Sequence, residues 1–315
     1  MLTNPSSVEL AHSVFIIIPV HNRRAVTIQC LAHLQTQGDL DTYNTIVVDD
    51  ASTDGTAEVI TTQYPSITIL QGSGQLWWTG AITMGMRHAY QQGATHLIWL
   101  NDDCLVPQGT FKNLVRFVDK HPDTIVGAQG YSDIDQTRLA FGGKHPQRWH
   151  YKLFRCPRGE TAPCDMLSGN LVCIPRAVVD TIGLPDTRLP HYGGDTLYLI
   201  QARQAGFRLF VDARTAPIDV PGQSAVYPQS WMLQGGAPFK VMSLIFKPQS
   251  MLSWRVWWVL LIKDYGIFGA FIFLGKYCQM LFRLALITGL RFLPLPVRQK
   301  LMLLKQSALS KPDIG

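Results

Sequence analysis

Residues 96–104 read His-Leu-Ile-Trp-Leu-Asn-Asp-Asp-Cys, an apolar run that stops abruptly at two adjacent carboxylates. A short apolar run of this kind is typical of a buried strand, whose carboxyl end presents Asp102 and Asp103 at the edge of a sheet. In open α/β sheets, ligands bind in the crevice outside those ends. A second interpretation stays open, in which Asn101, Asp102 and Asp103 only open a turn, since Asn and Asp side chains bond the nearby backbone.

Three further strand-like segments precede this run. Each is short and rich in β-branched or apolar residues, and each is followed by polar or turn-forming residues. The stretch Pro19-Val20-His21-Asn22 is expected to end the first of them, and the second closes on Asp49 and Asp50. The three segments are residues 14–18, 45–48 and 67–70.

The segments between these strands carry apolar residues at helical spacing. Helices are expected from Arg23 to about Gln37, around residues 59–60 with Ser52 or Thr53 as the N-cap, and from Thr79 onward. Strands that alternate with helices predict an α/β protein with a mostly parallel, doubly wound sheet. The residues of the third helix that are expected to face inward are Ile82, Met86 and Ala89.

Residues 128–220 follow a less regular pattern, which favours an acceptor-binding region set against a nucleotide-binding half at about 14–127. Together the two halves are expected to form one domain, residues 1–220. The expected helices are 109–121 and 196–205, the expected strands and turns are 125–127, 138–143 and 167–175, and a polar stretch covers 144–159.

The positive charge of the chain is concentrated at its C-terminal end. The net charge is +6, and from Lys240 onward 11 basic residues face only two acidic ones, Asp264 and Asp313. A nucleic-acid-binding protein normally carries its basic residues on a folded reading surface. Here they alternate with Trp, Phe and Leu in one terminal block, which indicates an anionic membrane surface and no nucleic-acid partner.

Residues 221–315 are expected to form a basic, aromatic-rich helical tail. Its apolar segments are too short and too often interrupted by Lys or Arg to reach the roughly 18 apolar residues of a spanning helix. This pattern is typical of helices that lie in a membrane interface. The alternative is an amphipathic helix pair packed on the enzyme or on another subunit. The apolar segments are residues 254–263, 267–274 and 281–290.

The six cysteines form neither a C-x-x-C pair nor a paired zinc spacing, which favours reduced thiols in the cytosol. The N-terminal residues lack the basic-then-apolar pattern of a secretory signal. We therefore expect a cytoplasmic protein, bound peripherally to the inner face of the cell membrane.

Carboxylates end two of the expected strands, at Asp49-Asp50 and Asp102-Asp103. In a doubly wound sheet these ends converge on one edge. One pair is suited to accept hydrogen bonds from a base or ribose, and the other to hold Mg²⁺ or Mn²⁺ against a diphosphate, because these ions prefer oxygen ligands.

Three separated motifs occur in a fixed order: residues 17–23 (IIPVHNR), 46–56 (IVVDDASTDGT) and 99–103 (WLNDD). In this order they resemble the inverting family 2 glycosyltransferases with the GT-A fold, and look closest to the rhamnosyltransferase-like branch. The resemblance covers about residues 14–215.

The resemblance implies a donor site at the first two motifs and a metal site at the third. Pro19 and Asp50 match residues that line the nucleotide base pocket, and His21 and Asn22 lie beside them in the motif; a solvated loop histidine is the alternative for His21. The D-x-D motif of the family falls on residues 101–103, with Asn in place of the first carboxylate. Asp103 is then the expected ligand of a Mg²⁺ or Mn²⁺ ion, and Asp102 a ribose or metal-water contact.

The resemblance also implies a general base late in the domain, which maps onto Asp195. This residue would take the proton of an acceptor hydroxyl that attacks the anomeric carbon opposite the diphosphate. The alternative for Asp195 is a helix N-cap. An arginine that is usual in the family falls at Gln201, so any role for it is absent or belongs to Arg203.

Four residues are candidates for sugar or acceptor contacts, each with a plainer alternative. Trp78 is suited to stack on a sugar or to pack in the core, and Asn170 is equally explained by a turn. The resemblance also implies a third metal ligand, often a His after the last strand; no His occurs in residues 211–220, so Asp219 is a substitute candidate. The four candidates are Trp78, Gly169, Asn170 and His191.

These features predict an inverting glycosyltransferase of cell-envelope glycan synthesis. It would transfer a hexosyl or deoxyhexosyl group from a UDP-, dTDP- or GDP-sugar to a hydroxyl of a lipid-linked or polysaccharide acceptor. Two alternatives are a sugar nucleotidyltransferase, whose Gly-rich first loop is missing here, and a membrane-associated binding protein with an inactive GT-A domain.

Overall fold

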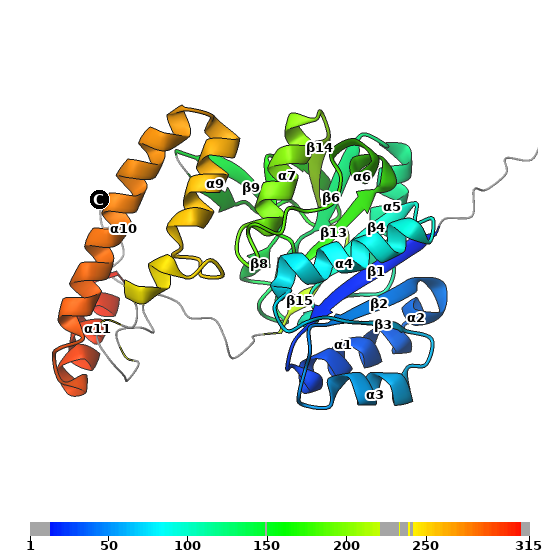
Figure 1. Ribbon diagram of the computed structural model, residues 1–315, viewed down its shortest axis with the longest axis horizontal. Helices are drawn as coiled ribbons and strands as arrows, with labels where there is room; N and C mark the ends of the chain where they lie inside the picture. The colour runs from blue at the N-terminus through cyan, green and yellow to red at the C-terminus, as the bar shows by residue number, and fades with distance from the viewer. Residues whose placement is uncertain (1–12, 149, 221–232, 234–238, 240–241, 310–315) are drawn as a thin grey trace, which may run out of the picture. The chain divides into compact units, whose positions relative to one another are not determined.

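The computed structural model describes residues 13–148, 150–220, 233, 239 and 242–309 (Figure 1). Contacts divide the chain into two compact units, Met1–Pro221 and Gly222–Gly315. The N-terminal unit holds the large sheet and the candidate site, and the C-terminal unit is helical. Each is described by itself below.

An eight-stranded sheet with the order β11-β14-β6-β13-β4-β1-β2-β3 forms the frame of the N-terminal unit. Six of its strands run in one direction, whereas β11 and β13 run antiparallel to their neighbours. The predicted mixed but mostly parallel α/β sheet is therefore confirmed. The strands are β1 (Val14–Val20), β2 (Asn44–Asp49), β3 (Thr68–Gln71), β4 (His96–Leu100), β6 (Thr124–Ala128), β11 (Thr161–Cys164), β13 (Leu171–Pro175) and β14 (Arg208–Asp212).

Helices cover both faces of this sheet. Ile16 and Ile18 of β1 belong to a core cluster with residues of α1 and α5. On the other face α4 approaches β1 so closely that a Cβ added to Gly85 would lie 2.4 Å from Ile17 Cγ2. The predicted inward residues of α4, Ile82, Met86 and Ala89, are fully buried. The helices are α1 (Arg24–Thr36), α2 (Asp39–Thr42), α3 (Thr56–Gln63), α4 (Trp77–Gln91), α5 (Thr110–Lys120), α6 (Arg176–Ile182) and α7 (Gly194–Gln204).

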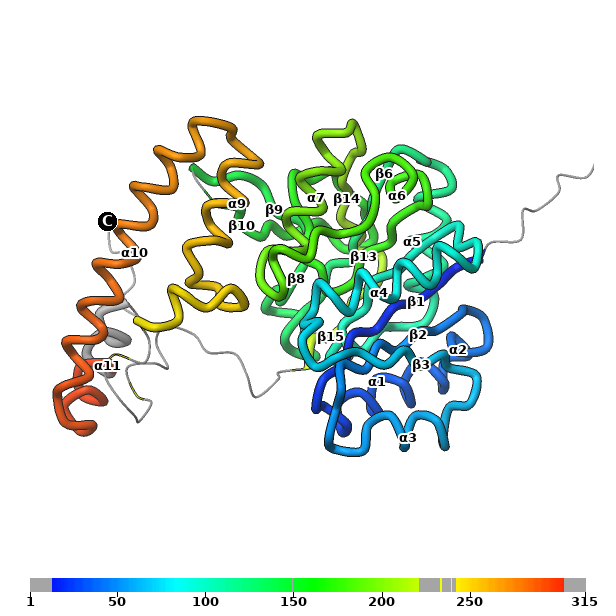
Figure 2. The backbone as a smooth tube through the Cα atoms, viewed as in Figure 1, coloured from blue at the N-terminus to red at the C-terminus, as the bar shows by residue number. Residues whose placement is uncertain are grey.

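Two small sheets complete the unit, and one of them brings a late segment to the end of β1. β15 pairs with β5 in antiparallel register, Asp219 opposite Cys104, and lies by the carboxyl end of β1 in both views (Figures 1 and 2). One small sheet contains β5 (Cys104–Leu105), β7 (Gly130–Tyr131), β8 (Leu139–Phe141) and β15 (Ile218–Asp219), and the other contains β9 (Gly143–Gln147), β10 (His150–Leu153) and β12 (Met166–Leu167).

β1 ends at Val20, within the predicted stretch 19–22, and Pro19 is still paired opposite Val48. Two local predictions need correction. The helix expected from Thr79 begins at Trp77. The stretch at 144–159, expected only as polar chain, contains the β9–β10 hairpin.

The predicted caps of α3, Ser52 and Thr53, are wrong. The N-cap residue is Gly55, and the carboxylate of Asp54 accepts the Thr56 N–H at 3.2 Å instead. The Ser52 hydroxyl accepts the N–H of Asn22 at 2.9 Å, and the Thr53 N–H donates to the Asn22 Oδ1 at 2.7 Å. These residues therefore tie the loop after β2 to the loop after β1.

The described part of the C-terminal unit is built on two consecutive helices. The apolar segments 267–274 and 281–290, expected separately, belong to one helix, α10, in which Lys276 and Arg283 interrupt the apolar residues. Its 23 residues, with a mean hydropathy of 1.5 in the best window, suffice by length and composition to cross a membrane. The elements are η2 (Met242–Phe246), α9 (Trp254–Tyr265), α10 (Phe268–Leu290) and α11 (Leu295–Leu309).

Candidate active site

Asp50 organises the loop after β2 and the start of α4. Its carboxylate accepts the backbone N–H groups of Gly74 at 2.6 Å and of Leu76 and Trp77 at 2.9 Å each. A carboxylate at a helix N-terminus is stabilised by the helix dipole. A carboxylate can accept about four hydrogen bonds, so one position is left for the predicted contact with a base.

His21 and Asn22 lie exposed beside Asp50 at the end of β1. The Nδ1 of His21 lies 2.7 Å from the carbonyl oxygen of Asp50, which fixes the ring orientation. Its Nε2 lies 3.1 Å from the Asn22 Nδ2. The predicted donor residues Pro19, His21, Asn22 and Asp50 therefore gather at neighbouring strand ends.

Arg23 joins both carboxylates of the WLNDD motif. One guanidinium nitrogen lies 3.0 Å from Asp102 Oδ1, and the other lies 2.9 Å from Asp103 Oδ2. Asp102 is only 2% exposed, and its second oxygen accepts the Thr27 hydroxyl at 2.8 Å. Burial raises the pKa of Asp102 to about 6, although the charge of Arg23 opposes this. Both carboxylate oxygens of Asp102 already have partners in the protein. The contact of Asp102 with a ribose therefore stays a prediction.

The sequence reading of Arg23 as a helix start missed this role. The signal that could have revealed the role of Arg23 is its position: a basic residue three positions after β1, beside the edge where two acidic motifs converge. Its side chain is 34% exposed, so the guanidinium reaches solvent while it bonds both carboxylates.

A second pair of carboxylates meets at Asp103. The Asp103 Oδ1 is buried and has no hydrogen-bond partner among the described residues. The pairing of β15 with β5 brings Asp219 close, and the Val220 N–H donates to the Asp103 carbonyl at 2.7 Å. Burial, followed by the negative charge of Asp103, raises the pKa of Asp219 to about 6. The predicted substitute ligand therefore lies beside the predicted ligand.

These residues fit a divalent cation. Three carboxylates, Asp102, Asp103 and Asp219, face a single guanidinium, and one carboxylate oxygen lacks a partner. Within the described ranges, no group of three or more His, Cys, Asp or Glu side chains is arranged to hold a metal ion by itself. Mg²⁺ and Mn²⁺ need no such cage, because one or two carboxylates with water and substrate phosphates suffice.

Asp195 lies in the first turn of α7 and contacts the loop before β13. Its Oδ2 accepts the Gly169 N–H at 3.0 Å, and its Oδ1 accepts the Thr196 N–H at 2.7 Å. The N-cap residue of α7 is Gly193, so Asp195 is not the N-cap. A Cβ added to Gly169 would lie 2.8 Å from the Asp195 Cβ and 3.1 Å from the Trp78 ring. Only glycine fits at position 169 without a shift of its neighbours.

Asn101 connects this region to the metal-site carboxylates. The Trp78 Nε1–H donates to the Asn101 side-chain oxygen at 2.9 Å, and the Asn101 N–H donates to the Asn170 carbonyl at 2.9 Å. Trp78 also packs edge-on against Trp99 of β4, with the ring centroids 5.3 Å apart. The Asn that replaces the first carboxylate of the motif therefore positions Trp78 at the site.

His191, a predicted acceptor contact, lies beside Trp77 and near Asp195. Its ring lies 5.6 Å from the ring of Trp77, and its Nδ1 is buried without a hydrogen-bond partner among the described residues. Burial lowers the pKa of His191, although the nearby charge of Asp195 opposes this. A neutral imidazole beside the candidate base is therefore expected at neutral pH.

Arg203, the residue that could replace the usual family arginine, donates to the Asp165 carbonyl and the Tyr151 hydroxyl. These bonds give Arg203 a structural role.

Replacement of Arg23 by methionine is expected to lower the free energy of unfolding by about 1–3 kcal/mol, because Asp102 loses its counter-charge while Arg23 itself is partly exposed. Added Mn²⁺ should raise the melting temperature more in the variant than in the original protein, since the cation replaces the lost charge. Thermal unfolding with and without Mn²⁺ measures both effects. Arg24→Met, at the exposed neighbouring position, is the control. Equal stability of R23M and R24M would contradict the role of Arg23.

A family model described as "Glycosyl transferase family 2" matches residues 15–183. The chain belongs to glycosyltransferase family 2. This membership favours the transferase over the sugar nucleotidyltransferase that the sequence left open. Among curated protein sequences, none matches this family 2 glycosyltransferase significantly.

Solved structures with the same fold are glycosyltransferases. GalNAc-T7 with UDP, GalNAc and Mn²⁺ matches 69% of this chain at 16% identity and a TM-score of 0.56, and the match spans 45% of that chain. A mannosyltransferase of Pyrobaculum calidifontis with GDP-Man and Mn²⁺ matches 89% of this chain and 84% of its own, at 14% identity and a TM-score of 0.51. A TarS fragment of S. aureus with UDP matches 84% and 70%, at 15% identity and a TM-score of 0.52. At such identities the likeness shows the fold, and the expected GT-A fold is confirmed.

Proposed function

We propose that this family 2 glycosyltransferase transfers a hexosyl or deoxyhexosyl group, with inversion, from a nucleotide-diphosphate sugar to an acceptor hydroxyl. The observation that carries the proposal is that Asn101 connects a candidate base, Asp195, with a candidate cation ligand, Asp103. Asn101 precedes the Asp102-Asp103 pair in sequence and is hydrogen-bonded to Trp78 and Asn170, and Asp195 bonds the adjacent Gly169. The bound UDP and GDP-Man of the structural relatives support a UDP- or GDP-sugar class of donor, and the motif resemblance adds dTDP-sugars and a rhamnosyltransferase-like reaction.

On the acceptor side, Asp195 would take the proton of the attacking hydroxyl. The N–H groups of Gly169 and Thr196 donate to its two carboxylate oxygens and so fix the orientation of the side chain. Trp78, held by Asn101, offers a ring face or edge to the acceptor or the transferred sugar. His191, held neutral by burial, adds a polar group to the same side.

On the donor side, Asp103 and Asp219 would hold a Mg²⁺ or Mn²⁺ ion. When bound, the ion supplies Lewis-acid stabilisation of the departing diphosphate. Arg23 keeps Asp102 and Asp103 in place and compensates part of their charge. The carboxylate of Asp50 fixes the backbone around it by three hydrogen bonds, and the nucleotide base would bind beside this backbone.

We further propose a lipid-linked or polysaccharide acceptor in cell-envelope glycan synthesis, with the enzyme bound peripherally to the cytoplasmic face of the membrane. The support lies in α10, of which only 11% is buried within its most apolar window. At 100° per residue, its exposed aromatic and leucine residues fall within an arc of about 120° and form one stripe along the helix. These stripe residues are Phe268, Phe271, Leu274, Phe282 and Leu286.

A donor screen tests the proposed reaction. The full chain is incubated with UDP-, GDP- or dTDP-sugars and Mn²⁺, and release of the nucleoside diphosphate is measured with and without EDTA. We expect saturable, EDTA-sensitive release with one base class, because the backbone beside Asp50 is held in one conformation by three hydrogen bonds. Absence of both binding and release with all three base classes would contradict the proposal.

A further inference from the structure

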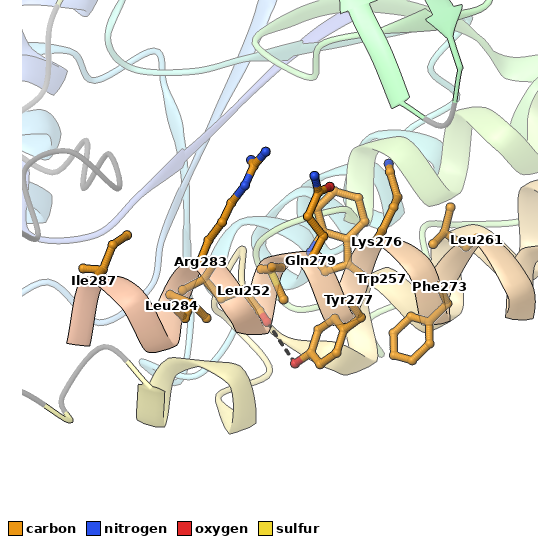
Figure 3. A pocket seen from close by; sticks show the side chains of 11 residues that line it. Leu252, Trp257, Leu261, Phe273, Lys276, Tyr277, Gln279, Arg283, Leu284 and Ile287 are labelled. Carbon is orange, nitrogen blue, oxygen red and sulfur yellow. Dashed lines mark hydrogen bonds between the residues drawn. The ribbon is translucent and has the colours of Figure 1, made fainter. Parts of the chain in front are cut away.

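A cavity lies between α9 and α10 in the C-terminal unit (Figure 3). Its volume is about 290 Å³, and its walls are mainly apolar, with Trp257 from α9 and Phe273, Tyr277 and Met280 from α10. Apolar cavities of this size that carry a few polar groups are typical of ligand sites. The Tyr277 hydroxyl donates to the Leu252 carbonyl at 3.4 Å, which leaves its ring in the wall.

Two cationic side chains border this cavity. Lys276 and Arg283 are seven residues apart on α10, about 10 Å along the helix axis, and extend to the same side with Gln279 between them (Figure 3). The Lys276 ammonium lies over the Trp257 ring, 4.9 Å from its centroid. The cavity therefore combines an apolar interior with a positively charged edge.

The charge and surface of this unit favour one class of occupant. Between Lys240 and the end of α11, Asp264 is the single acidic residue in the sequence, so an anion is favoured. At 100° per residue, Lys276 and Arg283 lie about 60–80° around the helix from Phe268 and farther from Phe271 and Phe282, so they border the exposed stripe. A lipid that carries an anionic head satisfies the apolar walls and the charged edge together.

We propose that this cavity binds one lipid by its hydrocarbon chain, with a phosphate head group held by Lys276 and Arg283. The inference rests on the proposed membrane association for the source of the lipid. It goes beyond that proposal, because it assigns a discrete, stoichiometric lipid site in addition to general adsorption on a membrane surface.

Binding of three matched probes to the full chain tests the proposal. The probes are palmitoyl lysophosphatidate, monopalmitoyl glycerol with the same chain but no phosphate, and glycerol phosphate with no chain, each below its micelle concentration in equilibrium dialysis. We expect one lysophosphatidate per protein, binding at least about tenfold weaker for the neutral lipid, and none for glycerol phosphate. Equal binding of the two lipids would overturn the phosphate site, and tight binding of glycerol phosphate would overturn the chain site.

Variants that replace a charged side chain by glutamine remove the charge but keep a polar side chain, so the fold is expected to persist. Lys276→Gln with Arg283→Gln should weaken lysophosphatidate binding to the level of the neutral lipid, while Lys300→Gln, the same change on exposed α11, should leave it unchanged. A filled cavity, Met280→Trp, should weaken binding of both lipids. Unchanged lysophosphatidate binding in the double variant overturns the proposal. Donor hydrolysis by the same proteins is read separately, so failure of the transferase proposal is distinguished from failure of the lipid site.

Discussion

Replacement of Asp195 by asparagine is expected to lower the transfer rate by about 10²–10⁴-fold, because the acceptor hydroxyl loses its proton acceptor. The substitution is nearly isosteric, and its side-chain oxygen can still accept the Gly169 N–H that Asp195 accepts at 3.0 Å. Donor binding is expected to persist, since the residues assigned to the nucleotide lie on other loops. Steady-state transfer and equilibrium binding of the donor separate the two quantities.

The matched control for this variant is Asp135→Asn, an exposed acid before β8. It removes the same charge far from α7 in sequence and is expected to retain full activity. If Asp195→Asn transferred sugar at the rate of Asp135→Asn, the base would have to be another group. Loss of donor binding together with activity would instead point to a structural role for the carboxylate.

The second large effect is expected for Asp103→Asn, which should weaken Mn²⁺-supported donor binding by about tenfold or more, since a cation site loses one of its few formal charges. The Arg23 guanidinium stays bonded to Asp102, so the local fold is expected to persist. Calorimetric titration of the donor with and without Mn²⁺ measures the effect directly and needs no turnover.

Asp219→Asn is expected to weaken the same Mn²⁺-dependent binding, because Asp219 lies beside the unpartnered oxygen of Asp103. Glu58→Gln on the exposed face of α3 serves as the control for the loss of one negative charge. If Asp103→Asn and Glu58→Gln gave the same cation-dependent affinity, the metal role of Asp103 would be wrong.

The sequence predicts the parts of the fold that depend on local pattern. Apolar runs located β1, β2 and β4, and the acids behind them located the edge where Asp50 and Asp103 lie, because each signal is contained in a few consecutive residues. Cap assignments failed at Ser52 and Thr53, since both were engaged by Asn22, a residue 30 positions away. Local propensity cannot report such a competing partner.

The remaining parts of the site depend on pairing between distant segments. Asp219 reaches Asp103 only because β15 pairs with β5, and Arg23 reaches Asp102 only because β1 and β4 are neighbours in the sheet. β13 runs antiparallel to both of its neighbours, β4 and β6. Its five residues alone do not predict this direction. Register and direction are properties of the assembled sheet, so a periodic pattern does not contain them.

The reversed direction of β13 has a consequence for how this enzyme can diversify. Because Leu171 pairs with Leu100, the amino end of β13 lies beside the carboxyl end of β4. Residues 168–170 therefore lie at this sheet edge just before β13 begins, whereas the proposed donor loops lie at the same edge just after β1, β2 and β4 end. Changes in length or sequence just before this segment would reshape the proposed acceptor side while the strands that carry the proposed donor residues keep their register. If these assignments hold, acceptor preference can evolve separately from donor preference on one sheet edge.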